Sequence, residues 1–426
     1  MPLQNPLWEI IEPHLVSAGL YTVQDPTYGR WLLPPHPPHL SLINDPGVSH
    51  NYRRVFLPPY GSFKSKQEAY DSTQIIHAED VKLVKEELET GVKHGGRWVC
   101  YSTWEMKDEP KGGWDGGGKG RGRDLVLIHG LSDYGLRYAP HIPYFVKCGF
   151  RVIVPDLPSY GRSTGMNSYI PSLLLLPAAL HVVLTDVVQN DLARGREQRK
   201  VFLSGASMGG WTVLYYILKY PPTSSPEVVV SQAADPDATP PEEGAGKGYG
   251  DAERSRKGEK TRIHVAGAFV LCPMVEASKS SRPNIVLEYI GRAIVYVAGS
   301  LPLAKAVRGN VSDDPKVEED FFSDPLCYHA WLRVGTGLAL LEGMVELERR
   351  AEEIDVPIRL VHGNADRATS HLGTLRLFDR LPNPDKEIEI YDGYEHVMLK
   401  VGSDEADDEK RQRVLADWKS WLLQRC

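Results

Sequence analysis

The chain has 426 residues, of which 42% are hydrophobic and 25% are charged, a balance typical of globular proteins with a sizeable buried core. Its 49 lysines and arginines are outnumbered by 56 acidic residues, which makes the formal net charge −7 at pH 7. Because nucleic-acid binding needs a basic face, this charge argues against a nucleic-acid partner. The cysteines are five, widely spaced and without a CxxC pair, which favours reduced thiols in a cytoplasmic protein over a disulfide framework or a zinc site.

The first part of the chain has a composition of its own. Residues 1–82 are rich in proline and aromatic residues, and we interpret them as an irregular N-terminal extension wrapped on the main domain. An arm that docks on a partner or a membrane is the alternative. The start of the chain has acidic residues within its apolar stretch, unlike a secretory signal. The longest apolar runs, 173–184 and 293–304, are shorter than the roughly 20 residues that a membrane span needs.

A half-exposed strand is expected over 96–106, where polar and apolar residues alternate. The glycine-rich run that follows has no GxGxxG register and comes before a strand instead of after one, so it does not predict nucleotide binding. Further strands are expected where short apolar, β-branched runs occur, at 124–130, 150–156, 199–205, 264–272, 357–363 and 386–391. Helical stretches lie between them, for example 170–192, 208–220 and 405–423. This alternation predicts an α/β fold with a doubly wound, mostly parallel central sheet and helices on both faces.

Two segments interrupt the alternation. Residues 222–262 are polar and rich in proline, glycine and charge, so we expect a disordered surface insertion. Residues 274–352 are apolar and helical, and they separate two predicted strands. We interpret them as a helical cap above the carboxyl ends of the strands, where the active sites of such sheets lie. The core is then expected in two parts, 83–273 and 353–426.

The sequence GASMG, residues 205–209, fits the G-x-S-x-G pattern of a nucleophilic serine. With 39 glycines in the chain the pattern alone is weak evidence. Its context is stronger, since a strand precedes Ser207 and a helix follows it, and glycines at 205 and 209 allow a sharp turn. A free serine is a poor nucleophile at neutral pH, so Ser207 would need a base.

An acid and a base follow in the order that this kind of turn requires. Asp366 comes just after one late strand and His396 just after the next, so both would lie at the same sheet edge as Ser207. His396 would accept the serine proton, and Asp366 would fix the tautomer of the imidazole. Two alternatives stay open: Asp366 could only cap the helix that starts near Thr369, and Asp156 could be the acid.

Backbone N–H groups are expected to complete the site. One would come from Met208, directly after the serine, and one from Leu131, in the loop after the first central strand. Two other histidines, His129 and His362, precede glycines at strand ends, and we interpret them as structural.

With these motifs the chain resembles the monoglyceride lipase, or lysophospholipase-like, branch of the α/β-hydrolase superfamily. The resemblance runs from about 84 to 426 without 222–262, and includes IHGLSDYGLRY, VPDLPSYGRSTG and YDGYEHVML. The segment DPLCYHAWLRVGTGLALLEGM (324–344) is the most specific part, since the general superfamily motifs do not contain it. The resemblance implies the same triad and oxyanion donors, a mobile membrane-facing cap, and polar residues Asp133 and Arg137 at the alcohol end.

The expected function is therefore a serine esterase, most specifically one that cleaves a monoacylglycerol through an acyl-enzyme. No metal or organic cofactor is implied. The expected substrate is a small lipid ester, and the resemblance leaves open a peripheral contact of the cap with membranes or lipid droplets. Alternatives are a lysophospholipid, another ester or a peptide as substrate. An acyltransferase and a non-catalytic binding protein are more distant alternatives.

Overall fold

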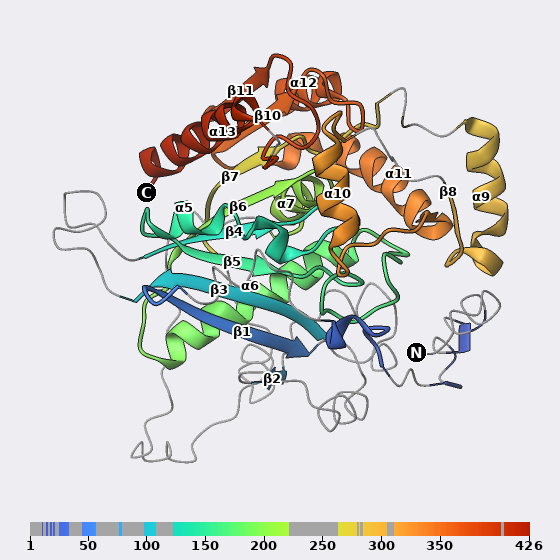
Figure 1. Cartoon of the computed structure of the whole chain (residues 1–426), viewed down its shortest axis with the longest axis horizontal. Coiled ribbons are helices and arrows are strands. Elements are labelled where there is room, and N and C mark those ends of the chain that lie inside the picture. The colour runs from blue at the N-terminus through green and yellow to red at the C-terminus, as the bar shows by residue number, and fades with distance from the viewer. Residues whose placement is uncertain are drawn as a thin grey trace, which may run out of the picture.

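The structure is a computed structural model, shown in Figure 1. It describes the isolated positions 11, 14, 15, 18, 20, 21 and 281, and the ranges 25–33, 45–56, 76–78, 98–107, 122–220, 263–278, 284–304, 311–401 and 404–426. The predicted disordered insertion at 222–262 and most of the predicted extension lie outside these residues.

Nine strands of the described chain form one central sheet, in the order β11-β10-β7-β6-β4-β5-β3-β1-β2. Their bounds are β1 Val48–Phe56, β2 Ile76–Ala78, β3 Trp98–Met106, β4 Arg123–Ile128, β5 Arg151–Pro155, β6 Lys200–Ala206, β7 Val265–Leu271, β10 Ile358–Gly363 and β11 Lys386–Tyr391. The six strands from β11 to β5 pair in parallel, and β3, β1 and β2 pair antiparallel. The predicted mostly parallel α/β sheet is confirmed, and each of its late strands lies within one residue of its predicted start.

Helices cover both faces of the sheet. One face carries α5 (Ile142–Val146) and α13 (Glu405–Gln424), whose Phe145, Trp418 and Trp421 pack in one apolar cluster. The other face carries three helices in a second cluster. They are α6 (Leu175–Ala193), α7 (Met208–Lys219) and α12 (His371–Arg380). The helix α6 is apolar almost all round, and most of it is buried, as expected of a helix covered on several sides.

Between β7 and β10 the chain leaves the sheet. This segment contains α9 (Ile285–Ala298), β8 (Pro302–Ala304), α10 (Pro315–Ser323), β9 (Leu332–Arg333) and α11 (Val334–Arg349), before the short η4 (Ala351–Glu353). In Figure 1, α10 crosses in front of the sheet and α9 lies at the edge of the molecule, against α11. Among the described residues, none of the helices combines the length and the apolar character needed to cross a membrane.

Two expectations about the early part of the chain are wrong. The strand β3 is buried over most of its length and not half-exposed, because its side chains pack into the apolar clusters on both faces of the sheet, Val99 and Tyr101 in one and Trp104 in the other. The strand β1 falls within the range expected to be an irregular extension, yet it pairs with β3 over nine residues. The sheet therefore begins before position 83.

A short segment near the N-terminus is also fixed to the core. It includes η1 (Arg30–Leu32), and the Arg30 side chain is buried. Its guanidinium donates hydrogen bonds of 2.7 to 2.9 Å to the carbonyl oxygens of Gly161, Ser163 and Gly165. This part of the predicted extension thereby holds the loop that follows β5.

Candidate active site

Ser207 lies in a sharp turn between β6 and α7. Its backbone has φ 58° and ψ −120°, a left-handed conformation that is costly for a residue with a side chain. A Cβ at position 209 would lie 2.1 Å from the carbonyl oxygen of Ile128, and one at position 205 would lie 2.5 Å from the carbonyl carbon of Gly209. Only glycine fits at these two positions, so the G-x-S-x-G pattern is required by the close approach of β4, β6 and α7.

The predicted acid and base lie side by side. Asp366 follows β10 and His396 follows β11, and these two strands pair in parallel and in register. Nδ1 of His396 lies 2.7 Å from Oδ2 of Asp366. The other ring nitrogen, Nε2, is thus left for a partner in the cavity where His396 and Ser207 both line the wall.

Asp366 receives several other hydrogen bonds. Its Oδ1 accepts from the backbone N–H groups of Ala368 and Thr369, at 2.7 and 2.9 Å. Its Oδ2 accepts from the hydroxyl of Thr369 at 2.9 Å. The helix that follows is capped by Ser370 and not by Asp366. Helix capping is therefore not the role of this carboxylate, which instead orders its own turn and contacts His396.

The charges of the pair stabilise one another. Burial alone would raise the pKa of Asp366, but His396 and the hydrogen bond from His362 outweigh it, so the pKa lies well below 3.8. Burial alone would lower the pKa of His396, but Cys272 and the Asp366 carboxylate outweigh it, so the pKa lies well above 6.5. A carboxylate that stays ionised and raises the basicity of an imidazole is the electrostatic arrangement of a general base.

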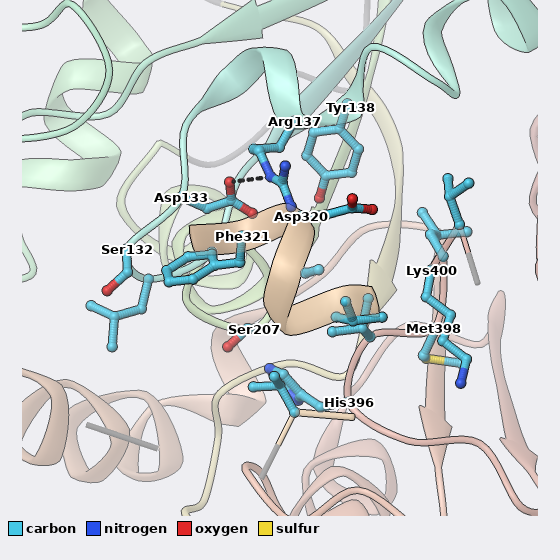
Figure 2. A pocket seen from close by; sticks show the side chains of 18 of the residues that line it. Ser132, Asp133, Arg137, Tyr138, Ser207, Asp320, Phe321, His396, Met398 and Lys400 are labelled. Carbon is cyan, nitrogen blue, oxygen red and sulfur yellow. Dashed lines mark ion pairs between the residues drawn. The ribbon is translucent and has the colours of Figure 1, made fainter. Parts of the chain in front are cut away.

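A cavity of about 550 Å³ opens over Ser207 and His396. Its walls come from the loop after β4, from α10 and from the loop after β11. In the view of Figure 2, Ser207 and His396 lie on one side of α10, and the ion pair of Asp133 and Arg137 lies on the other. Apolar side chains form a large part of the lining, among them Leu136, Val311, Val317, Phe321, Phe322, Met398 and Leu399.

The two predicted oxyanion donors lie beside Ser207. Met208 is the first residue of α7, directly after the serine. The loop before Leu131 touches the serine turn, since a Cβ at Gly130 would lie 3.5 Å from Cβ of Ser207. Leu131 itself lines the cavity. Met208 thus follows Ser207 directly, and Leu131 belongs to the loop that lies against the serine turn.

The polar residues Asp133 and Arg137 line the same cavity. Nε of Arg137 lies 3.2 Å from Oδ1 of Asp133, and Nη1 lies 3.7 Å from Oδ2 of the buried Asp324. The Tyr134 hydroxyl donates to that Asp324 oxygen at 2.8 Å. Burial raises the pKa of Asp133 to about 6, with Arg137 opposing the shift. This group of charges forms a fixed polar end of the cavity.

Asp156, the alternative candidate for the acid, has a structural role. Asp156 accepts hydrogen bonds from the backbone N–H groups of Gly135 and Arg162, both at 2.9 Å. It thereby joins the loop after β4 to the loop after β5 and does not contact His396. His129 is also structural, as expected: its Nε2 accepts from the Leu157 N–H at 2.9 Å, and burial lowers its pKa to about 4.

Sequence reasoning missed the part played by His362. Its side chain is fully buried, and its Nε2 lies 3.0 Å from Oδ2 of Asp366. Its Nδ1 lies 2.8 Å from the Thr374 hydroxyl. The available signal was its place at the end of β10, four residues before Asp366, but such a position is also common for purely structural histidines.

Cys272 was likewise not singled out. It has a positive φ of 35°, and its Sγ lies 3.3 Å from the His396 carbonyl oxygen. Among the described residues, donor atoms of Cys272, Asp366 and His396 lie within 4.8 Å of one another. This spacing would allow them to bind a metal ion. However, Nδ1 of His396 is hydrogen-bonded to Asp366, and Asp366 already accepts bonds from four other groups. The arrangement fits a hydrogen-bonded triad better than a set of metal ligands.

The chain is similar to a known protein family and to several known lipases. The family model for serine aminopeptidase, S33, matches residues 122–244 and 254–400. The monoacylglycerol lipase of Mycolicibacterium smegmatis is 23% identical and covers 77% of this chain and 94% of its own length. The monoglyceride lipase of Rattus norvegicus is 28% identical, and the match covers 72% of this chain and 83% of the relative's own length. The crystal structure of a soluble variant of monoglyceride lipase from Saccharomyces cerevisiae superposes with a TM-score of 0.57 at 17% identity, covering 78% and 92%.

Proposed function

Because this chain belongs to the serine aminopeptidase S33 family of α/β-hydrolases, we propose that it is a serine esterase whose substrate is a monoacylglycerol. The observation that carries the proposal is the Nδ1–Oδ2 distance of 2.7 Å between His396 and Asp366, beside a cavity that Ser207 also lines. Ser207, His396 and Asp366 are the proposed nucleophile, base and acid.

The proposed reaction has two stages. The Ser207 hydroxyl attacks the ester carbonyl while Nε2 of His396 takes its proton, and the N–H groups of Leu131 and Met208 stabilise the oxyanion. The C–O bond to glycerol then breaks as His396 returns the proton to the departing alcohol. In the second stage a water molecule, deprotonated by His396, attacks the acyl-enzyme; the bond between the acyl carbon and Oγ of Ser207 breaks, His396 returns the proton to that oxygen, and a fatty acid is released.

The charges along the cavity favour a neutral head group. Each cation of the lining is already paired with carboxylates: Arg137 with Asp133 and Asp324, Lys400 with Asp407 and Glu395, and Arg411 with Asp408. A phosphate would have to compete with these ion pairs, whereas a glycerol hydroxyl can hydrogen-bond to Asp133 or Arg137 without breaking them. The names of the curated relatives support the same substrate class.

The size and the apolar lining of the cavity favour a substrate with a single acyl chain. A cavity of about 550 Å³ is within the usual range of small-molecule sites, and apolar residues of α10 and of the loop after β11 would surround the chain. A neutral head group and one apolar tail are the features of a monoacylglycerol.

Contact with a lipid surface through α9 is part of this proposal. Six apolar residues of α9 are at least 49% exposed, namely Ile285, Val286, Leu287, Tyr289, Ile290 and Val297. The opposite side of the helix packs on α11, where Gly291 lies against Val334 and Leu338. An apolar helix face of this kind can insert into the interface of a membrane or a lipid droplet, where the substrate is dissolved.

Labelling with a fluorophosphonate probe tests the catalytic part of the proposal. The unmodified chain should label and hydrolyse monoacylglycerols, and Ser207→Ala should abolish both. Substrate panels of 1- and 2-monoacylglycerols, lysophospholipids, short esters and aminoacyl amides then test the substrate class. Labelling without turnover of any acylglycerol would reject the lipase assignment but keep the hydrolase; no labelling at all would reject both.

A further inference from the structure

The loop that carries His396 is tied to the wall of the cavity through the two residues beside the histidine. Glu395 accepts hydrogen bonds from the Ser312 hydroxyl and from the Asp313 backbone N–H, both at 2.7 Å. On the other side, the Val397 N–H donates to the Val311 carbonyl oxygen at 3.2 Å. His396 thus sits between two residues that both bind the segment 311–313.

The segment 311–313 leads directly into α10. Its next residue, Asp314, caps the helix by accepting from the Lys316 N–H at 2.9 Å. Further along, Phe321 and Phe322 line the cavity that Ser207 also lines. Figure 2 shows Phe321 on this wall. The position of α10, which forms this wall of the cavity, therefore depends on the segment 311–313 that Glu395 binds.

The acid side of the site is joined to the same segment. Nη2 of Arg367, the residue after Asp366, lies 2.6 Å from Oδ1 of Asp313 and 3.6 Å from Oε1 of Glu395. The Glu395 side chain is only 15% exposed, and Nζ of Lys400 lies 3.4 Å from Oε2, the oxygen that also accepts from Ser312. These donors hold the Glu395 carboxylate in one place. Because His396 is the next residue, its backbone is held in place as well.

We propose that Glu395 is a positioning residue that fixes His396 and the α10 wall of the cavity relative to each other. The inference rests on the proposed esterase function of Ser207 and His396. It adds that one side chain sets both the reactivity of the base and the shape of the acyl site. Loss of the Glu395 carboxylate would then affect the chemistry and the binding of long acyl chains together.

The Glu395→Ala variant tests this in the full-length protein. We expect the rate constant of fluorophosphonate labelling to fall roughly 10- to 100-fold, as for small displacements of catalytic groups. For nitrophenyl esters, we expect kcat to fall for both acetyl and decanoyl substrates. KM should rise more for the decanoyl than for the acetyl ester, because the longer chain has more contact with the α10 side chains that line the cavity.

Two further variants keep the test informative if Glu395→Ala folds poorly. Ser312→Ala removes one of the two donors that the segment 311–313 offers to Glu395, and Glu395→Gln keeps one acceptor oxygen. Both variants should therefore change the labelling rate, kcat and KM in the same direction as Glu395→Ala but by less. The matched control is Asp392→Ala, in the same loop, whose carboxylate binds Asn364 at 2.7 Å and makes no contact with 311–313. This control should stay within about twofold of the unmodified chain.

The outcomes separate the two proposals. If the unmodified chain does not label, the esterase function and this inference are both wrong. If it labels and the Glu395 and Ser312 variants behave like Asp392→Ala, the inference alone is overturned. It is also overturned if their activity falls only in proportion to the unfolded fraction in thermal melts, with no rise in KM for the decanoyl ester.

Discussion

Nε2 of His362 lies 3.0 Å from Oδ2 of Asp366, the same oxygen that contacts His396 at 2.7 Å. Burial lowers the pKa of His362, so its ring is neutral and carries a single N–H. Since Asp366 is ionised and can only accept, that proton lies on Nε2, and Nδ1 accepts from Thr374. The acid of the proposed triad is thus held between two imidazoles.

The His362→Ala variant should lower kcat/KM roughly 10-fold, because Asp366 would lose a donor that orients it toward His396. Glutamine at this position can donate to Asp366 through its amide and accept from Thr374, so His362→Gln should retain more of the activity. Steady-state kinetics of both variants at equal folded fraction checks this. Equal losses in the two variants would contradict an orienting hydrogen bond.

The pH dependence of kcat/KM should reflect the raised pKa of His396. The base works only when its ring is neutral, and a raised pKa keeps it protonated to a higher pH. We therefore expect the acidic limb of the profile in the free enzyme to have its midpoint above pH 6.5.

The Asp366→Asn variant tests the cause of that shift. Without the carboxylate, one of the two groups that raise the pKa of His396 against burial is lost, and the midpoint of the acidic limb should move down in pH. The rate should also fall by about 10⁴-fold, because an amide can hold the wrong tautomer of the imidazole. A midpoint that stays in place would mean that Asp366 does not set the pKa of His396.

The two glycines of the serine turn should differ sharply from glycines elsewhere. Gly209→Ala would place a Cβ 2.1 Å from a backbone oxygen of β4, so we expect destabilisation by about 3 kcal/mol or more, or failure to fold. The control is Gly337→Ala in α11, where a Cβ would lie 3.4 Å from the Leu332 side chain. That change should be neutral or stabilise by up to about 1 kcal/mol. Urea denaturation measures both.

Binding to lipid surfaces should depend on α9. Leu287 is 62% exposed, and Leu287→Asp should weaken binding to phosphatidylcholine vesicles roughly 10-fold or more, because a buried leucine contributes about 1.5–3 kcal/mol. The matched control is Leu372→Asp on α12, which is 53% exposed and adds the same charge. Co-sedimentation that is equally weakened in both variants, or in neither, would argue against α9 as the contact.

Much of this molecule could be read from residue patterns along the chain. The strands β4, β5, β6, β7, β10 and β11 were predicted from short runs between helical segments, most of which are β-branched and apolar. The candidate residues Ser207, Asp366 and His396 were predicted because each lies in the connection that follows one of those strands. Parallel strands end at one edge of a sheet, so this placement brings the three residues together without any knowledge of side-chain packing.

Other features depend on contacts between residues far apart in the chain. β1 joins the sheet by pairing with β3, and no motif in its own residues marks it as part of the core. Ser312 is 83 residues from Glu395, and no local pattern predicts that the two side chains meet. His362 looked like an ordinary strand-end histidine until α12 brought Thr374 to one ring nitrogen and the turn after β10 brought Asp366 to the other. Local patterns identify elements because they reflect each residue's own solvation and backbone preference, whereas these contacts arise when whole elements pack.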